Sequence, residues 1–412
     1  MLEVASGPMA NSERILTTHV GSLPRPPQLI ELAARRDTEE HPDEAIFEGE
    51  LAAAVAEAVR AQHTVGIDVV GDGEFGHPMG EDYDYGPWLR YVFERLDGLE
   101  LTSATAATSP QPASDEVVLA PMTERRDWVL FHEAYGDPRS GVALPAWSPD
   151  SPWPVVRGPI SYGGQKALAR DIANFKAALA ASGLDDGFLN AVGPASCARL
   201  ANEHYATDEE LLYACAEAMR EEYTSIIEAG LMLQIDDPVI ADNWDQINPA
   251  PSLEAYRRFT KVRIEALNHA IRGLPRERIR FHLCWGSWHG PHVTDIPLAD
   301  IIDLMLAVKA GAYSFEAANV RHEHEWRVWQ EVALPEGTRL LPGVVSHATN
   351  VVEHPQLVAD RICRYAELVG RENVIASTDC GLGGRVHPQI AWAKLESLAR
   401  GAAIASERLW KR

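Results

Sequence analysis

Apolar and polar positions alternate along this chain in two rhythms. Short apolar runs rich in β-branched residues are separated by longer stretches of helical periodicity, such as LAAAVAEAVRAQ and LADIIDLMLAVKAG. This alternation is typical of repeated strand–helix units and a parallel sheet. The expected strands are ILTTHV from Ile15, GIDVV from Gly66, FLNAV from Phe188, LMLQI from Leu231, IRFHL from Ile279, AYSFE from Ala312, LLPGVV from Leu340 and NVIAS from Asn373. Eight such units favour an α/β fold of the (β/α)8 TIM barrel class over an open doubly wound sheet.

The stretch from about residue 80 to residue 159 breaks this rhythm. It carries four tryptophans, many prolines and the polar run TSATAATSPQPASDE. We interpret it as an excursion inserted between the second and third strands, which is either a loop packed on the side of the barrel or a lid or subunit contact. We expect one barrel over residues 13–412, preceded by a tail over residues 1–12 that is frayed or a remnant of cloning.

Charge and cysteine content narrow the class of protein. The 60 acidic and 37 basic residues give a net charge of -23, which would repel a phosphate backbone and an anionic membrane surface. No apolar run approaches the length of a membrane-spanning helix, and no leader-like segment opens the chain, so a cytoplasmic location is expected. The five cysteines are too few and scattered for a disulfide framework, and Cys215 and Cys363 fall in helical patterns typical of buried positions.

Polar residues follow the expected strands directly. The strand ends read HVGS, GDGE, GPAS, DDP, HLCWG, EAAN, SHATN and TDCG. In a (β/α)8 barrel the C-terminal ends of all strands face one mouth, so distant residues can converge there. Buried Asp, Glu and His are costly unless they are paired or bind a metal. The sequence therefore predicts a functional site at this mouth.

Four of these residues suit one zinc ion (Zn²⁺). His282 and Cys284 lie two positions apart on a strand, so their side chains point to the same face. Glu316 and Cys380 would arrive from the ends of other strands. Two thiolates, an imidazole and a carboxylate prefer zinc to magnesium or calcium.

Several motifs resemble one family. TTHVGSLPRP, GDGEF, QIDDP, HLC and TDCG are similar to motifs of the cobalamin-independent methionine synthases, in the catalytic C-terminal barrel. The resemblance implies the same four zinc ligands. It implies that Ser22, Glu74 and Asp236 bind the amino-acid substrate, that Asp236 also serves catalysis, and that His347 transfers a proton.

The chain departs from this family in two ways. It has room for one barrel, whereas the full-length synthases resemble a duplicated one. The segment GPASCARLANEHY carries Leu200 where the family has a tryptophan that stacks on the folate pterin. This change argues against a polyglutamylated methylfolate donor. The epoxyalkane:coenzyme M transferases, which are single-barrel relatives, also look similar.

The resemblance implies a zinc-dependent transferase that activates a homocysteine-like thiol for S-methylation or alkylation, as in methionine biosynthesis. The expected partners are a small-molecule thiol and an alkyl donor. Asp236 and Glu74 would attract a substrate ammonium and repel a sulfonate, which favours an amino-acid thiol. The alternatives are epoxide opening by a thiol and a zinc-stabilised binding barrel without catalysis. Assembly into a homo-oligomer stays open.

Further polar residues lie in the loops near the expected mouth. Four histidines could form a second metal site, although solvated histidines that shape the pocket are the favoured interpretation: His289, His292, His322 and His324. Arg385 could bind an anionic substrate tail.

Overall fold

A seven-stranded parallel sheet forms the centre of the protein. The computed structural model describes residues 13–38, 43–77, 87–103, 117, 119–142 and 152–410, and the expected tail over residues 1–12 lies outside this part. The strand order is β1-β10-β9-β8-β7-β6-β4. The bounds are β1 Leu16–Thr17, β4 Phe188–Val192, β6 Met232–Asp236, β7 Ile279–Leu283, β8 Ala312–Phe315, β9 Arg339–Val345 and β10 Ile375–Thr378. Seven of the eight expected segments therefore contain a strand.

The expected second strand is reduced to isolated bridges. Val69 bridges Thr18 and Gly71 bridges Phe188, both in parallel. The side chain of Gln62 occupies backbone groups that a regular ladder would use, because its Oε1 accepts from Gly71 N at 3.0 Å and its Nε2 donates to Gly71 O at 2.8 Å. These bridges lie between the edge strands β1 and β4, and the parallel sheet is curled.

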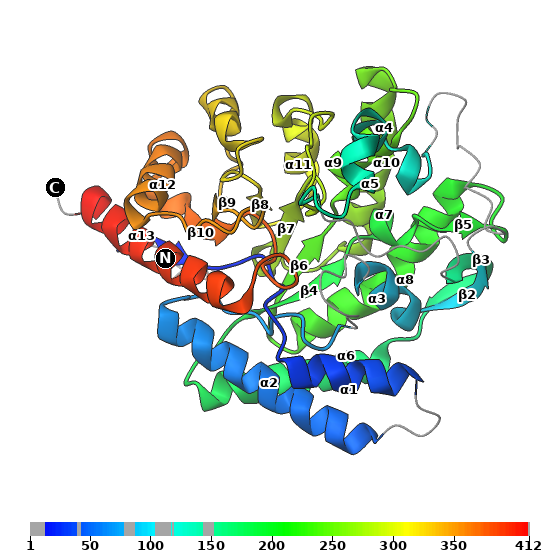
Figure 1. Ribbon diagram of the computed structural model, residues 1–412, viewed down its shortest axis with the longest axis horizontal. Helices are drawn as coiled ribbons and strands as arrows, with labels where there is room; N and C mark the ends of the chain where they lie inside the picture. Colours follow the sequence, from blue (N-terminus) through cyan, green and yellow to red (C-terminus); the bar gives the residue numbers. More distant parts are fainter. Residues whose placement is uncertain are drawn as a thin grey trace.

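Helices cover the outside of the curled sheet (Figure 1). The bounds are α1 Pro27–Thr38, α2 Glu44–Val65, α6 Gln165–Ala181, α8 Asp208–Glu228, α9 Val239–Gln246, α10 Leu253–Ala270, α11 Ile302–Ala307, α12 Pro355–Val369 and α13 Pro388–Trp410. The sequence marks their ends. The Asp43 side chain caps α2 by accepting from Ile46 N at 3.2 Å, and Gly66 ends it with a φ of 95°. Within the described residues, no helix has the length and apolar character needed to cross a membrane.

The core has two parts. A large cluster fills the space between helices and sheet, and a smaller one gathers Val69, Phe188, Met232, Ala312, Leu341 and Ile375. The smaller cluster draws most of its members from different strands, one side chain from each. Arg280 of β7 is fully buried, and its guanidinium lies 3.9 Å from the centre of the Phe188 ring. It donates to Thr18 Oγ1 at 3.0 Å and to His19 O at 2.9 Å, so both amino groups of its guanidinium have a hydrogen-bond acceptor.

The described parts of the expected insertion contain helices and strands. Its described parts contain α3 Pro87–Arg95, β2 Leu96–Ser103, α4 Arg126–Leu130, α5 His132–Gly136 and β3 Pro152–Tyr162, while residues 78–86, 104–116, 118 and 143–151 lie outside the description. β2 pairs antiparallel with β3, and β3 pairs parallel with β5 (Ala201–Asn202), which follows α7 (Pro194–Cys197). This small sheet lies to one side of the central sheet (Figure 1). Buried polar contacts anchor it, since Arg95 binds Asp171 at 2.7 Å and Tyr162 donates to Glu222 of α8.

Candidate metal centre

Three predicted zinc ligands meet at the C-terminal ends of two strands. His282 lies at the end of β7, Cys284 follows the strand, and Cys380 follows β10. Their candidate ligand atoms all lie within 4.8 Å of one another. His282 and Cys284 are buried, with 2% and 6% of their surface exposed. Strands β8 and β9 separate β7 from β10 in the sheet, so the curl of the sheet is what brings these residues together.

The imidazole of His282 is oriented as a ligand would be. Its Nδ1 lies 3.2 Å from Ser314 Oγ in the neighbouring strand β8. Its Nε2 is buried and has no hydrogen-bond partner within the described part of the chain. A histidine that binds a metal through one nitrogen commonly has the other fixed by a hydrogen bond. One imidazole and two cysteines are a donor set that fits zinc.

The thiols of Cys284 and Cys380 have pKa values shifted in opposite directions. A hydrogen bond from Cys284 lowers the pKa of the Cys380 thiol well below its usual value against the opposing effect of burial, and His282 lowers it further. The same contact, with burial, raises the pKa of Cys284 well above its usual value. The cluster thus already stabilises one thiolate, which is the form of cysteine that binds metals.

Glu316, the fourth predicted ligand, falls in an adjoining group. Its carboxylate lies within 4.8 Å of candidate ligand atoms of His347 and Asp379. Its Oε1 accepts from Trp285 N at 3.0 Å, and its Oε2 accepts from Asn319 Nδ2 at 2.6 Å. Burial raises the pKa of Glu316 to about 8. The carboxylate is therefore beside the residue that follows Cys284, but it is held by protein donors.

Asp379 has a supporting role in this arrangement. Its carboxylate accepts from the backbone N of Ala317, Ala318 and Asn319 at 2.7 to 2.8 Å. These contacts fix the turn that follows Glu316 to the residue that precedes Cys380.

His347 lies two residues beyond β9 and is buried. Its Nδ1 has no hydrogen-bond partner in the described structure, and its carbonyl lies 3.3 Å from His289 Nε2. Burial lowers the pKa of His347 to about 3. At neutral pH this side chain is therefore a neutral imidazole and a weak base, and its Nδ1 is a ring nitrogen that no described protein group occupies.

Two predicted carboxylates, Asp236 and Glu74, are buried and close enough for their charges to interact, and Asp236 also interacts with His282 and Cys380 of the cluster. Asp236 ends β6, and its Oδ2 accepts from Asn190 Nδ2 at 2.8 Å. A Cβ placed on Gly21 would lie 2.2 Å from Glu74 Oε1 and 2.4 Å from Asn190 Nδ2, so the side chains of Glu74 and Asn190 converge on this glycine. Burial, and then the charge of Asp236, raises the pKa of Glu74 well above its usual value. Burial also raises the pKa of Asp236 to about 6.

Ser22 joins the first strand to the loop after Cys380. Its carbonyl accepts from Leu382 N at 2.8 Å and Gly383 N at 3.0 Å.

Sequence reasoning missed Asn190 and Gln234, whose amides both donate to Asp236. The signal was present, because each is a polar residue in the middle of an apolar strand.

Two of the loop histidines are engaged with acids. Asp295 Oδ2 lies 3.0 Å from both His292 Nδ1 and His322 Nε2, and Glu325 lies 2.9 Å from His322 Nδ1. His324 is exposed. None of the four loop histidines belongs to a metal-type cluster in the part of the chain that the structure describes.

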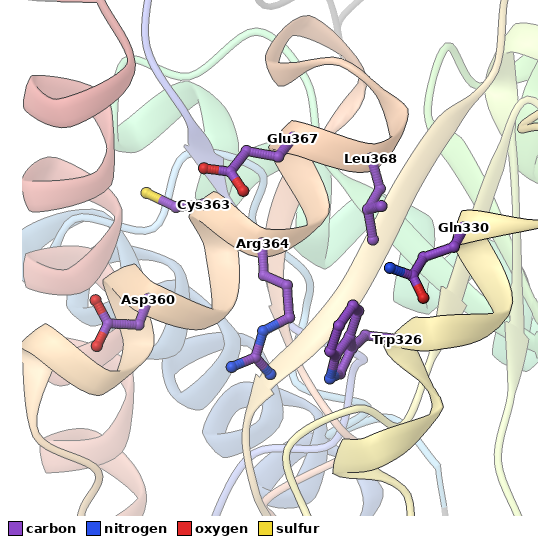
Figure 2. Close-up of a pocket in the computed structure, with 7 residues that line it drawn as sticks. All are labelled: Trp326, Gln330, Asp360, Cys363, Arg364, Glu367 and Leu368. Carbon is purple, nitrogen blue, oxygen red and sulfur yellow. The ribbon is translucent and has the colours of Figure 1, made fainter.

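The remaining predicted features lie around the centre. Arg385 donates to Ser287 Oγ at 2.8 Å, in the loop that follows Cys284. Leu200 is buried in the core with 1% of its surface exposed, so it offers no face to a ligand. A surface hollow between η4 (Glu323–Gln330) and α12, lined by Trp326 and Arg364 among others, shares no residue with the centre (Figure 2).

Comparison with known proteins gives a consistent assignment. Residues 148–403 match the family model of the cobalamin-independent synthase catalytic domain. A methionine synthase of Thermococcus kodakarensis is 23% identical over 95% of this chain and 94% of its own length. A 2-hydroxypropyl-CoM lyase of Xanthobacter autotrophicus is 24% identical over 96% of both chains. A solved B12-independent methionine synthase from a Shewanella species, in complex with selenomethionine, covers 97% of this chain and 100% of its own at 19% identity, with a TM-score of 0.67. Since the family model spans more than half of the sequence, the chain belongs to the cobalamin-independent synthase family.

Proposed function

We propose that this protein is a zinc-dependent transferase that moves a methyl or other alkyl group onto the sulfur of a small amino-acid thiol. The observation that carries the proposal is the buried cluster of His282, Cys284 and Cys380, with the buried carboxylates Asp236 and Glu74 near enough for their charges to interact. The family assignment and the methionine synthase relative support the same chemistry.

The proposed frame is one (β/α)8 barrel over residues 13–412 with an insertion at about residues 80–159. The parallel bridges of Val69 to Thr18 and of Gly71 to Phe188 support it, because they stand where the eighth strand would close the sheet. Closure would place all strand ends at one mouth.

His282, Cys284 and Cys380 would hold the ion, with Glu316 as the fourth protein ligand. Glu316 would then exchange one of its present hydrogen bonds, from Trp285 N or Asn319 Nδ2, for the ion. A bound zinc ion lowers the pKa of a coordinated thiol and favours the thiolate, which is the nucleophilic form.

Asp236 and Glu74 would bind the ammonium group of the thiol substrate, with Ser22 alongside. Two buried carboxylates that lie close together favour the arrival of a cation, because a positive charge relieves both their desolvation and their mutual repulsion. Asn190 and Gln234 orient Asp236 through two amide hydrogen bonds.

His347 would move the proton. Its Nδ1, which has no hydrogen-bond partner in the described structure, would accept the thiol proton and later donate it to the leaving group. Burial lowers the pKa of this imidazole and the charge of Cys380 raises it, so the step needs negative charge at the centre. In this reaction the new sulfur–carbon bond forms as the bond between the alkyl carbon and the leaving atom breaks. The leaving atom keeps the electron pair and receives the proton.

Epoxide opening by a thiol is the second candidate, and the 2-hydroxypropyl-CoM lyase relative favours it. Here the sulfur–carbon bond forms as an epoxide carbon–oxygen bond breaks, and the epoxide oxygen keeps the electron pair and receives the proton. The carboxylates of Asp236 and Glu74 favour an ammonium-bearing thiol over a sulfonate.

The test is a screen of zinc-loaded protein with homocysteine, coenzyme M and other thiols against methyl donors and epoxides, with products identified by mass spectrometry. We expect an S-alkylated amino-acid thiol. Turnover with coenzyme M and an epoxide alone would establish the second candidate. A zinc-replete protein that alkylates no thiol would overturn both.

A further inference from the structure

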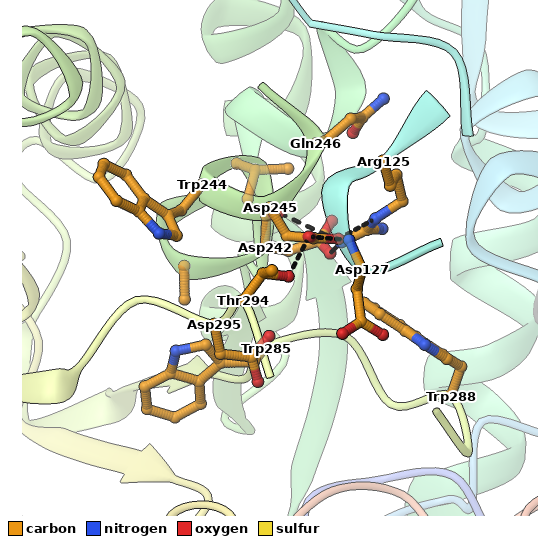
Figure 3. Close-up of polar contacts among 12 residues, drawn as sticks. Arg125, Asp127, Asp242, Trp244, Asp245, Gln246, Trp285, Trp288, Thr294 and Asp295 are labelled. Carbon is orange, nitrogen blue, oxygen red and sulfur yellow. Dashed lines mark hydrogen bonds and ion pairs between the residues drawn. The ribbon is translucent and has the colours of Figure 1, made fainter. Parts of the chain in front are cut away.

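A buried arginine links the insertion to helix α9 and to the loop that follows Cys284. Arg125 precedes α4 and has 3% of its surface exposed. Its Nε donates to Asp245 Oδ2 at 2.7 Å, and its second amino group forms an ion pair with Asp242, so both carboxylate partners belong to α9 (Figure 3). α9 begins three residues after Asp236. The insertion is thereby tied to the element that follows a predicted substrate-binding carboxylate.

The same guanidinium packs on Trp288. Its carbon lies 4.2 Å from the centre of the indole ring, and Trp288 lies four residues beyond Cys284 (Figure 3). Stacking of arginine on an indole adds a cation–π attraction to the ion pairs. Arg125 therefore contacts the segment that leaves the candidate metal centre.

The loop over residues 285–292 is built around this indole. A Cβ on Gly286 would lie 2.0 Å from a Trp288 ring carbon, and one on Gly290 would lie 2.3 Å from Trp288 Nε1. The Trp288 Nε1 donates to Tyr135 OH of the insertion at 2.9 Å. The loop can hold this shape only while the indole stays in place.

Asp127, two residues after Arg125, makes a second connection between the insertion, α9 and this loop. Asp127 of α4 accepts from Val293 N at 3.0 Å and from His292 N at 3.3 Å, and its own N donates to Asp245 Oδ1 at 2.9 Å. In sequence, His289 lies between Trp288 and His292, and its Nε2 is 3.3 Å from the carbonyl of His347. The loop thus spans from the insertion to the proton-transferring histidine of the proposed function.

We propose that Arg125 is a positioning residue: through Trp288 it fixes the loop that leads from Cys284 to His289, and it thereby shapes the site that binds the thiol. This inference rests on the proposed function. Its contacts with Asp242, Asp245 and Trp288 connect it to α9 and to the loop after Cys284, so it acts through the loop.

The chain offers a matched control. Arg95 is another buried arginine of the insertion that pairs with two carboxylates, Asp171 and Glu222, and stacks on an aromatic ring, Tyr91. Its partners lie on α6 and α8, away from the 285–292 loop. Arg125→Lys and Arg95→Lys keep one positive charge and remove the planar fork in both cases.

The experiment labels the protein with 5-fluorotryptophan and assigns the Trp288 fluorine resonance through Trp288→Phe. Zinc content, homocysteine affinity by calorimetry and thermal unfolding are measured on the same samples. We expect Arg125→Lys to shift the Trp288 resonance and to weaken homocysteine binding about tenfold while zinc is retained. Arg95→Lys should lower thermal stability and leave the Trp288 resonance unchanged. Its effect on homocysteine affinity should be smaller than that of Arg125→Lys, because Arg95 reaches the loop that carries Glu74 indirectly, through Asp171.

The inference is overturned if the Trp288 resonance does not move in Arg125→Lys, or if the two arginine variants change affinity equally. Should Arg125→Lys not fold, Asp245→Asn removes one of its two partners and the same readouts apply. A wild-type protein that binds no thiol would sink the proposed function, and the resonance would then decide separately whether Arg125 orders the loop.

Discussion

Asp295 Oδ2 lies 3.0 Å from His322 Nε2, and the imidazole stacks on Trp285 with ring centres 3.9 Å apart. Trp285 immediately follows Cys284, so this pair holds a buried positive charge close to the candidate metal centre. Burial opposes that charge, but hydrogen bonds to Asp295 and Glu325 outweigh it and raise the pKa of His322 to about 10.

This pair predicts how stability depends on pH. Because the folded pKa lies above the unfolded value of about 6.5, the stabilisation is complete below about pH 6.5 and is lost as pH rises toward about 10. Urea unfolding at pH 6.5, 8 and 9.5 should show a smaller loss of unfolding free energy in His322→Gln than in the wild type. Identical slopes for the two proteins would show that His322 is not charged in the folded state.

The zinc site can be tested by metal analysis alone. Cys284→Ser and Cys380→Ser should each lose most of about one zinc per chain, because each removes a thiolate from a small donor set. Cys363→Ser is the control, since Cys363 lies on α12, belongs to no metal-type group of the described residues and should leave zinc content unchanged. Full zinc in both cluster variants would contradict the ligand assignment.

His347→Asn should separate catalysis from binding. Loss of a proton-transfer group typically costs about 10²–10⁴-fold in rate, whereas zinc content and thiol affinity should stay near wild type. The rate, the metal content and the zinc-edge absorption with bound thiol are the three measurements. If zinc leaves with activity, His347 is a ligand or a structural support. If none of the three changes, the proton comes from elsewhere, and His289 or Asp379 is tested next.

Leu200 predicts the choice of donor. A methylfolate with a single glutamate should be a poor methyl donor, because the residue at the family's stacking position is an aliphatic side chain buried in the core. Initial rates with this folate and homocysteine, compared with other methyl donors at equal concentration, measure the effect. Efficient transfer from the folate would refute the inference and would weaken the epoxide alternative as well.

Most strands were predictable because each is an apolar run closed by polar residues. The second was not, because the amide of Gln62 in α2 takes the backbone groups of Gly71, and a contact between a helix and a strand end leaves no periodic signal. The antiparallel pair β2 and β3 was also missed, since its prolines and glycines resemble loop composition.

The site was predictable in its residue types but only partly in its grouping. His282, Cys284 and Cys380 come together as expected, while Glu316 is grouped with His347 and Asp379. Local sequence could not show that Asn319 Nδ2 and Trp285 N donate to the Glu316 carboxylate and so compete with a metal ion for it. Nor could it reveal the ion pair of Arg125 with Asp242, because these residues are 117 positions apart.

The pairing of β1 with β10 has a consequence for biosynthesis. Val20 N donates to Thr378 Oγ1, which lies 358 residues further along the chain, and the Ser22 carbonyl accepts from the similarly distant Leu382 N. A ribosome must therefore finish nearly all of the described chain before β1 can pair with β10, although its other neighbour, Val69, is made early. Until then the nascent protein has an open sheet edge and an incomplete centre, because Cys380 follows β10.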